Sequence, residues 1–218
     1  PLSRLKVTRA CELTLTVNAG ETLSNSWKIW VFPHVSLPSS DDAVLYTKEL
    51  GTDAIGRLSR GGTVVWIPEP SHVKGRKSVF HNHFWNPIMF AWPPMTLGCL
   101  MHDGGGMFVD FPTEGHTDWQ WWDILENAKV MELQGMPSGL VPFIQVIDSF
   151  DSNKKLGIGF EARACGGRII VLALDTEKDI DIRPATRQLL HSIDMYVRDG
   201  EFNPSVEVSE QDLMSLYE

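Results

Sequence analysis

Hydrophobic and polar residues alternate with a period of two in two segments near the start of the chain. Residues 11–17 read CELTLTV, residues 27–32 read WKIWVF, and turn-forming residues 18–21 lie between them. This period is typical of a strand with one buried face, so the pattern predicts an antiparallel pair. Two strands alone are marginally stable. We therefore expect the pair either to join a sheet formed by later strands or to be the last part of a β-sandwich.

The pattern changes after residues 33–42, whose sequence PHVSLPSSDD has the composition of a linker. Short apolar segments at 43–47 and 63–67 flank a helical pattern at 52–60. Strand, short helix and strand indicate a βαβ unit, and hence parallel pairing in an α/β domain. The sequence predicts two parts: residues 1–40, a strand segment and linker, and residues 41–218, an α/β domain with a mostly parallel sheet.

Further elements are expected along the second part. Residues 68–94 show no periodicity, and a segment of this length without regular structure is often functional. A helix at 183–198 has an apolar stripe formed by Leu189, Ile193, Tyr196 and Val197. The other expected elements are strands at 95–101, 129–133 and 143–147, a hairpin at 156–164 and 168–174, and a helix at 210–217 that begins at Ser209.

Residues 111–125, FPTEGHTDWQWWDIL, hold three of the eight tryptophans. Thr117 and Gln120 have the spacing of a capping box, which predicts the start of a helix. From that start Trp119, Trp122 and Leu125 share one face, and Trp121 and Ile124 widen it. We expect this face to be buried in the core, because each ring removes a large apolar area from water. The alternative is an exposed stacking surface.

Composition excludes some classes of function. The net charge of −9 and the pI near 5.2 argue against binding of nucleic acid, which needs clustered basic residues. The short basic run at 74–77 indicates a solvated loop, and no apolar segment is long enough to cross a membrane. Because the chain opens with Pro1 rather than Met, we expect it to be an excised piece, and its localisation cannot be derived from the N-terminus.

A metal site and a nucleophilic cysteine are the two sharpest catalytic hypotheses. His81 and His83 would lie on one side of a strand, and His102, Asp103, His116 and Asp118 could complete a ligand shell. The H-x-H spacing is common, so we predict neither metal nor cofactor. Cys99 lies in LGCLM, which lacks the small residue of a nucleophile elbow. We expect Cys99, like Cys11 and Cys165, to be a small buried residue without a disulfide.

A binding crevice is a further hypothesis. In open parallel sheets ligands bind outside the carboxyl ends of the strands, where the loops after 63–67 and 95–101 begin. If those strands are neighbours, several titratable groups line one crevice, and tryptophans could stack on sugar rings there. The candidate binding residues are His81, His83, Trp85, His102, Glu114, His116 and Trp121. The alternative is that the loop packs on another domain or subunit. Glu114, Asp118 and Glu161 could serve glycoside hydrolysis, but the sequence pairs no two of them.

Four segments carry a resemblance to a known family. These are HNHFWNP at 81–87, DFPTEGHTDWQWWDIL at 110–125, the stretch 142–171 and RPATRQLLHSI at 183–193. They resemble the C-terminal region of bacterial family 2 glycoside hydrolases, which are β-galactosidase-like and often described as sugar-binding. NSWKIWVFP at 25–33 is similar to the last strand of the β-sandwich that precedes that region.

The resemblance implies a flavodoxin-like, class I glutamine-amidotransferase-like fold and a non-catalytic accessory domain. The catalytic carboxylates of that family belong to a barrel that does not fit in this chain, so no catalytic residue is carried over. The implied partners are the catalytic barrel and β-sandwich domains of the parent, with carbohydrate or a second copy of the chain as further partners. The implied parent is periplasmic or secreted. Open alternatives are a carbohydrate-binding module and a free-standing enzyme that uses a His/Asp metal site or Cys99.

Overall fold

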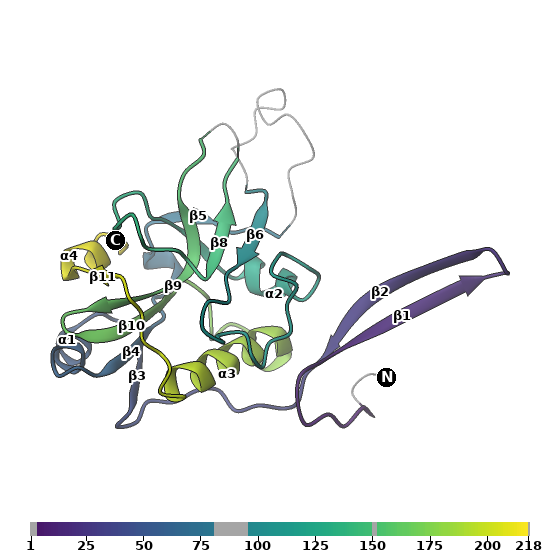
Figure 1. Cartoon of the computed structure of the whole chain (residues 1–218), viewed down its shortest axis with the longest axis horizontal. Coiled ribbons are helices and arrows are strands. Elements are labelled where there is room, and N and C mark those ends of the chain that lie inside the picture. The colour runs from purple at the N-terminus through teal and green to yellow at the C-terminus, as the bar shows by residue number, and fades with distance from the viewer. Residues whose placement is uncertain (1–3, 81–95, 150–151, 218) are drawn as a thin grey trace.

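The computed structural model describes residues 4–80, 96–149 and 152–217 (Figure 1). Strands β1 (Cys11–Ala19) and β2 (Leu23–Val31) form the predicted antiparallel pair, with Leu15 opposite Trp27. They form a separate two-stranded sheet that projects from the rest of the molecule. The expected buried face is absent along most of this hairpin, since Leu15, Val17 and Leu23 are 50%, 50% and 67% exposed.

The other nine strands form one sheet in which β9 (Leu156–Ala164) is central. Gly157 pairs with β7 and β8, and Gly159 pairs with β10 and β8. Since a strand residue has one partner on each edge, β8 lies on the opposite edge of β9 from β7 and β10. Strands β10 and β7 share one edge, and β8 and β11 share the other. The strands are β3 (Val44–Thr47), β4 (Thr63–Trp66), β5 (Gly75–Lys77), β6 (Gly98–Met101), β7 (Lys129–Glu132), β8 (Ile144–Ile147), β10 (Gly167–Leu172) and β11 (Glu207–Val208).

The predicted flavodoxin-like, amidotransferase-like fold with a mostly parallel sheet is wrong. The chain is mixed α/β and its strand pairs are mostly antiparallel. Parallel pairing is confirmed for β3 with β4 and recurs between β4 and β10 and between β9 and β11. The βαβ pattern at 43–67 predicts parallel pairing for the later strands too. Most of those strands pair antiparallel, after reversals of the chain direction. The tightest is the turn at Cys165 and Gly166, where both φ angles are positive, as in a two-residue hairpin loop.

The described residues form four α-helices around the sheet: α1 (Thr52–Ser59), α2 (Trp121–Glu126), α3 (Pro184–Arg198) and α4 (Glu210–Met214). Two 3₁₀ turns, at Pro70–His72 and Ile180–Ile182, link elements. The four residues of the predicted stripe on α3 are all buried, and Ser209 caps α4 in a capping box with Asp212. No helix in the described part of the chain is long and apolar enough to cross a bilayer.

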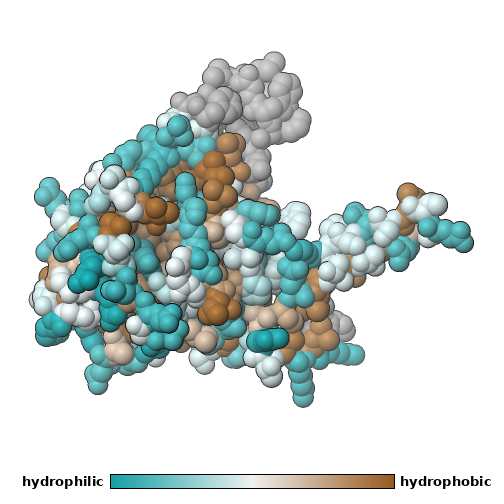
Figure 2. Space-filling model, viewed as in Figure 1, coloured by the Kyte–Doolittle hydropathy of each residue, from teal (hydrophilic) through white to brown (hydrophobic). Residues whose placement is uncertain are grey.

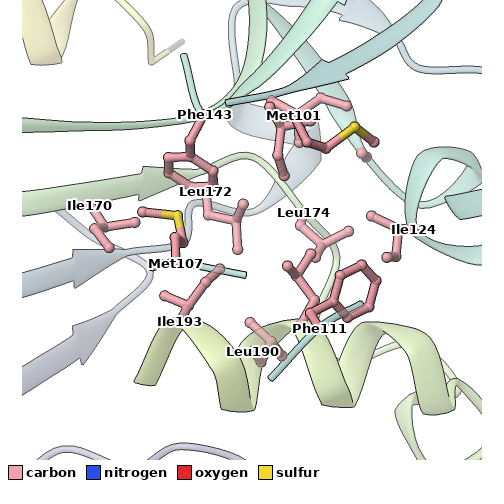
Figure 3. Close-up of a cluster of buried hydrophobic side chains, with 14 of the residues drawn as sticks. Met101, Met107, Phe111, Ile124, Phe143, Ile170, Leu172, Leu174, Leu190 and Ile193 are labelled. Carbon is pink, nitrogen blue, oxygen red and sulfur yellow. The ribbon is translucent and has the colours of Figure 1, made fainter. Parts of the chain in front are cut away.

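The core lies on both faces of the sheet. Alternate residues of β10 belong to different clusters: Ile169 and Val171 pack with α1 and α4, whereas Ile170 and Leu172 pack with α3. Figure 3 shows Leu172, Met107 and Phe143 gathered above Ile193 and Leu190 of α3. The sheet therefore gives a rigid two-sided scaffold, in contrast to the projecting hairpin.

Three local expectations are corrected by the structure. Thr117 does not cap α2, because its hydroxyl contacts the backbone of Cys99, while the Asp118 carboxylate accepts the backbone N–H of Gln120 at 3.0 Å. The expected solvated run at 74–77 contains β5, whose Arg76 forms ion pairs with Asp148 and Glu132. Trp119 and Trp122, expected to form a buried face, are both exposed.

Candidate functional site

A hollow of about 750 Å³ lies between the base of the β1–β2 hairpin and the first turns of α2 and α3. Hairpin residues form one wall, and residues around α2 and α3 form the other. We call this region the aromatic hollow. Its lining residues are Leu15, Trp27, Lys28, Ile29, Trp30, Phe32, Trp119, Gln120, Trp122, Asp123, Asn127, Lys178, Asp179, Ile182, Arg183, Pro184 and Ala185.

The tryptophans of the central motif divide between core and hollow. Trp121 is fully buried and meets Phe111 edge-on with ring centroids 5.2 Å apart. Trp119 and Trp122 are 69% and 60% exposed. The α2 helix is only six residues long, and Trp121, Ile124 and Leu125 form its buried face at i, i+3 and i+4. Trp122 therefore points away from the core and into the hollow.

A buried ion pair fixes the floor of the hollow. Arg183 is 5% exposed at its side chain, and its Nε donates to the Asp123 carboxylate at 2.7 Å. The other Asp123 oxygen accepts the Thr186 hydroxyl at 2.7 Å, and Arg183 also donates to the backbone oxygens of Asp175 and Lys178. These charge-assisted bonds join α2 to the start of α3. They also give the charged groups of Asp123 and Arg183 hydrogen-bond partners.

Three contacts hold the base of the hairpin beside the domain. Phe32 stacks on Phe111 with centroids 6.1 Å apart and an interplanar angle of 6°. Lys28 bridges Glu12 and Glu114. Farther along, Arg187 donates to the backbone oxygen of Val35 at 2.6 Å. The hairpin base is therefore anchored, although its outer half is not covered.

Two polar atoms in the lining of the hollow lack hydrogen-bond partners among the described residues. They are the indole nitrogen Nε1 of Trp30, a donor, and the amide oxygen Oε1 of Gln120, an acceptor. The amide nitrogen of Gln120 donates to the Pro112 oxygen at 2.6 Å, which fixes the orientation of the amide. Both atoms are enclosed by the surrounding protein, and a buried polar group without a partner is costly.

The predicted binding residues that the structure describes lie in different surroundings. Trp121 lies in the core, His102 bonds the Gln145 side chain at 2.7 Å, and the His116 Nε2 lies 3.7 Å from Glu114. His81, His83 and Trp85 lie outside the described residues. The predicted crevice required the strands at 63–67 and 95–101 to be neighbours, but β4 pairs with β3 and β10, whereas β6 pairs with β8. These strands are not neighbours.

The metal hypothesis depends on His81 and His83, which lie outside the described residues, whereas the structure does describe Cys99. Within the described ranges no group of three His, Cys, Asp or Glu side chains could hold a metal ion. Cys99 is buried in β6 as predicted, and burial raises the pKa of its thiol to about 12. A thiol with that pKa is a poor source of thiolate near neutral pH.

Sequence comparison gives one family match. A family model described as a domain of unknown function, DUF8487, matches residues 45–218. No curated protein matches the chain. The matched range starts within β3 and leaves out the β1–β2 hairpin, so the aromatic hollow lies across the boundary between hairpin and family domain.

Proposed function

The chain belongs to the DUF8487 family, and we propose that it is a non-catalytic accessory domain of a family 2 glycoside hydrolase. In this proposal the hairpin packs against another β domain of the parent protein. The observation that carries the proposal is the bare apolar face of the hairpin. The resemblance of residues 25–33 to the last strand of a β-sandwich supports the same conclusion.

The two faces of the hairpin differ in polarity. Residues directly opposite each other in an antiparallel pair point to the same face. Leu13 with Ile29, Leu15 with Trp27, and Ala19 with Leu23 therefore share one face, which Val17 and Asn25 complete. The other face holds Glu12 with Trp30, Thr14 with Lys28, Thr16 with Ser26, and Asn18 with Ser24, and it is polar except for Trp30 at the base of the hairpin. This pattern is that of a strand pair with one side packed on a core.

An uncovered apolar face of this kind indicates a partner surface. Figure 2 shows hydrophobic surface at the base of the projecting hairpin and again near its tip. Two isolated strands do not bury enough area to be stable, and large exposed apolar patches mark interaction sites. A second β-sheet fits best, because two sheets pack face to face through alternating side chains.

Site-specific crosslinking in the full-length gene product tests this proposal. A photoreactive phenylalanine analogue at Val17 reports on the apolar face, and the same analogue at Thr16 is the matched control on the polar face. We expect crosslinks to another segment of the same protein from Val17 and none from Thr16. Equal crosslinking from both positions, or none from Val17, would contradict the proposal.

Carbohydrate binding in the aromatic hollow is the second candidate. It is favoured by the exposed rings of Trp119 and Trp122, which line the hollow. Aromatic faces with a few polar groups are typical of ligand sites. Titration with a panel of oligosaccharides distinguishes the candidates: saturable binding lost in Trp122→Ala but kept in Val141→Ala would favour this second function.

Glycoside hydrolysis by the chain itself is not expected. Glu114 is held by Lys28 on the exposed surface, and Glu161 lies in a different pocket. A panel of aryl glycosides provides the assay. Turnover that disappears in Glu114→Gln would overturn the assignment as an accessory domain.

A further inference from the structure

A second pocket lies on the side of the domain where α3 meets β9, and the proposed function does not use it. It has a volume of about 310 Å³, which is at the lower end for small-molecule sites. Segments distant in sequence form its walls: the loop after β6, the segment before β8, the chain after α3, β9 and α3 itself. The lining residues are His102, Gly104, Gly105, Met107, Gly139, Leu140, Val141, Phe143, Glu161, Tyr196, Pro204, Ser205 and Val206.

Glu161 is the polar centre of this pocket. It interrupts a strand in which most other residues are buried and apolar or small. Its Oε2 accepts a hydrogen bond from the Tyr196 hydroxyl at 2.9 Å, the one hydrogen bond found for this carboxylate in the described ranges. Tyr196 is itself packed edge-on against Phe202 with centroids 5.4 Å apart. The carboxylate is therefore fixed in position, and its remaining capacity to accept hydrogen bonds is unused.

The glycine loop brings the pocket wall close to this pair. A Cβ atom at Gly105 would lie 2.7 Å from the Tyr196 hydroxyl, so only glycine allows this approach. The Asp103 carboxylate accepts the backbone N–H of Gly106 at 2.9 Å and holds the loop in place. Such a close approach keeps the wall ordered around the Glu161–Tyr196 pair.

The charge of the pocket selects the ligand. None of the described residues that line it is Lys or Arg, and Asp103 adjoins it. Burial raises the pKa of Glu161, an effect that the Tyr196 hydrogen bond opposes. Burial, the bond to Glu161 and the charges of Glu161 and Asp103 raise the pKa of Tyr196. A negative group in a pocket without a positive partner is stabilised by a bound cation.

We propose that this pocket binds a small organic ammonium ion, with the ammonium on the Glu161 carboxylate and an apolar body against Phe143 and Leu140. Phe143 and Leu140 are both buried and give the pocket an apolar wall. An ammonium group supplies the donors that the Glu161 carboxylate lacks, and aromatic rings also attract cations. The proposal does not depend on the role of the hairpin.

Benzylamine is the test ligand and benzyl alcohol its uncharged control of similar shape. Isothermal titration with the whole chain near neutral pH should show saturable binding of the amine and binding of the alcohol weaker by about tenfold or more, because a charge-assisted hydrogen bond is lost. Equal binding of the two compounds, or no binding of the amine, would overturn the proposal.

Variants identify the site. Glu161→Gln keeps an acceptor for Tyr196 but removes the charge, and should weaken amine binding by about tenfold or more. Val141, exposed at the rim, provides a second variant: Val141→Trp should block entry without disturbing the core. Glu132→Gln, in the ion-pair network of Arg76 and Lys154, is the control. If Glu161→Gln is folded and binds the amine unchanged, or if Glu132→Gln weakens binding equally, the proposal is wrong.

Discussion

Strand β9 alternates apolar residues with polar or small ones, as β1 and β2 do, but the two hairpins to which these strands belong lie in opposite environments. In β9–β10 both faces are covered, and Phe160, Ile169 and Leu172 are fully buried. In β1–β2 the same alternation of apolar residues leads to strands of nine residues that are mostly exposed. Alternation therefore determines which side chains share a face, but only the surrounding elements determine whether that face is buried.

The physical cause of the difference is the set of elements packed against each hairpin. Helices α1 and α4 cover one face of β9–β10, and α3 covers the other. No element in the described part of the chain lies over the outer half of β1–β2. The aromatic hollow lies only between the base of the hairpin and helices α2 and α3. The stability of the chain should therefore reside in the domain, while the hairpin is available for a partner.

The largest expected effect is a difference in stability between variants of two adjacent tryptophans. Trp121 lies in the core, and Trp122 lines the aromatic hollow. Trp121→Ala empties a fully buried site and should lower the free energy of unfolding by about 3–5 kcal/mol. Trp122→Ala is the matched control and should cost less than about 1 kcal/mol, because that ring is 60% exposed. Urea unfolding followed by far-UV circular dichroism gives both values. Equal losses would mean that Trp122 is covered in solution.

The next effect concerns the ion pair under the hollow. Asp123→Asn keeps the shape of the side chain but leaves Arg183, 5% exposed, without its charged partner. Because Asp123 itself is 25% exposed, we expect a loss of about 2–3 kcal/mol in unfolding free energy. Asp181→Asn is the control, since its pair with Arg187 is at the surface and should contribute almost nothing. A smaller loss for Asp123→Asn than for Asp181→Asn would contradict this ranking.

The local elements of the fold could be predicted from sequence, but their pairing could not. Helix α3 and the cap of α4 follow from patterns within a few residues. The neighbours of β9 depend on distant contacts: a Cβ at Gly157 would lie 2.8 Å from Pro142, and one at Gly159 would lie 2.5 Å from Phe143. Such packing selects glycine at both positions, and no local pattern shows which strands approach there.

The candidate site was missed for two reasons. The T-x-x-Q spacing predicts a helix start at Thr117, whereas the Thr117 hydroxyl bonds the backbone of Cys99 and the helix begins at Trp121 without a side-chain cap. With that start, Trp121, Ile124 and Leu125 become the buried face and Trp122 is exposed. The second reason is that residues far apart in the sequence form the site. The hairpin and the Asp123–Arg183 pair come together only in the folded chain. The i, i+3, i+4 spacing from Trp121 was the signal that could have found the exposed ring.

Two carboxylates, the buried Asp148 and the partly buried Glu161, should change stability with pH in opposite directions. Burial alone would raise the pKa of Asp148, yet hydrogen bonds from Ser152, Lys154 and Ser149 and the charge of Arg76 lower it. Its contribution is therefore present above the pKa of the unfolded state and is lost as pH falls through the lower folded value. Burial raises the pKa of Glu161, so its ionisation reduces stability as pH rises from the unfolded to the folded value.

Melting temperatures between about pH 3 and pH 7 test both signs. Asp148→Asn should lose stability at neutral pH and show a shallower loss on acidification than the wild type. Glu161→Gln should gain stability relative to the wild type as the pH rises. Parallel curves for either variant and the wild type would contradict the corresponding direction.

The smallest effect is expected in the hairpin, and it tests the comparison most directly. Changing Leu15, Val17 and Leu23 together to Thr removes the outer apolar face, while the β-branched side chain preserves the preference for a strand. Because these residues are at least half exposed, the free energy of unfolding of the chain should change by less than about 0.5 kcal/mol. Ile169→Thr in β10 is the control, and it should be strongly destabilising because it buries a hydroxyl in place of an ethyl group. If the triple variant loses more than about 1 kcal/mol, the face is covered even in the isolated chain. A loss that depends on protein concentration would then identify a second copy as the cover, and a loss that does not would identify the aromatic hollow.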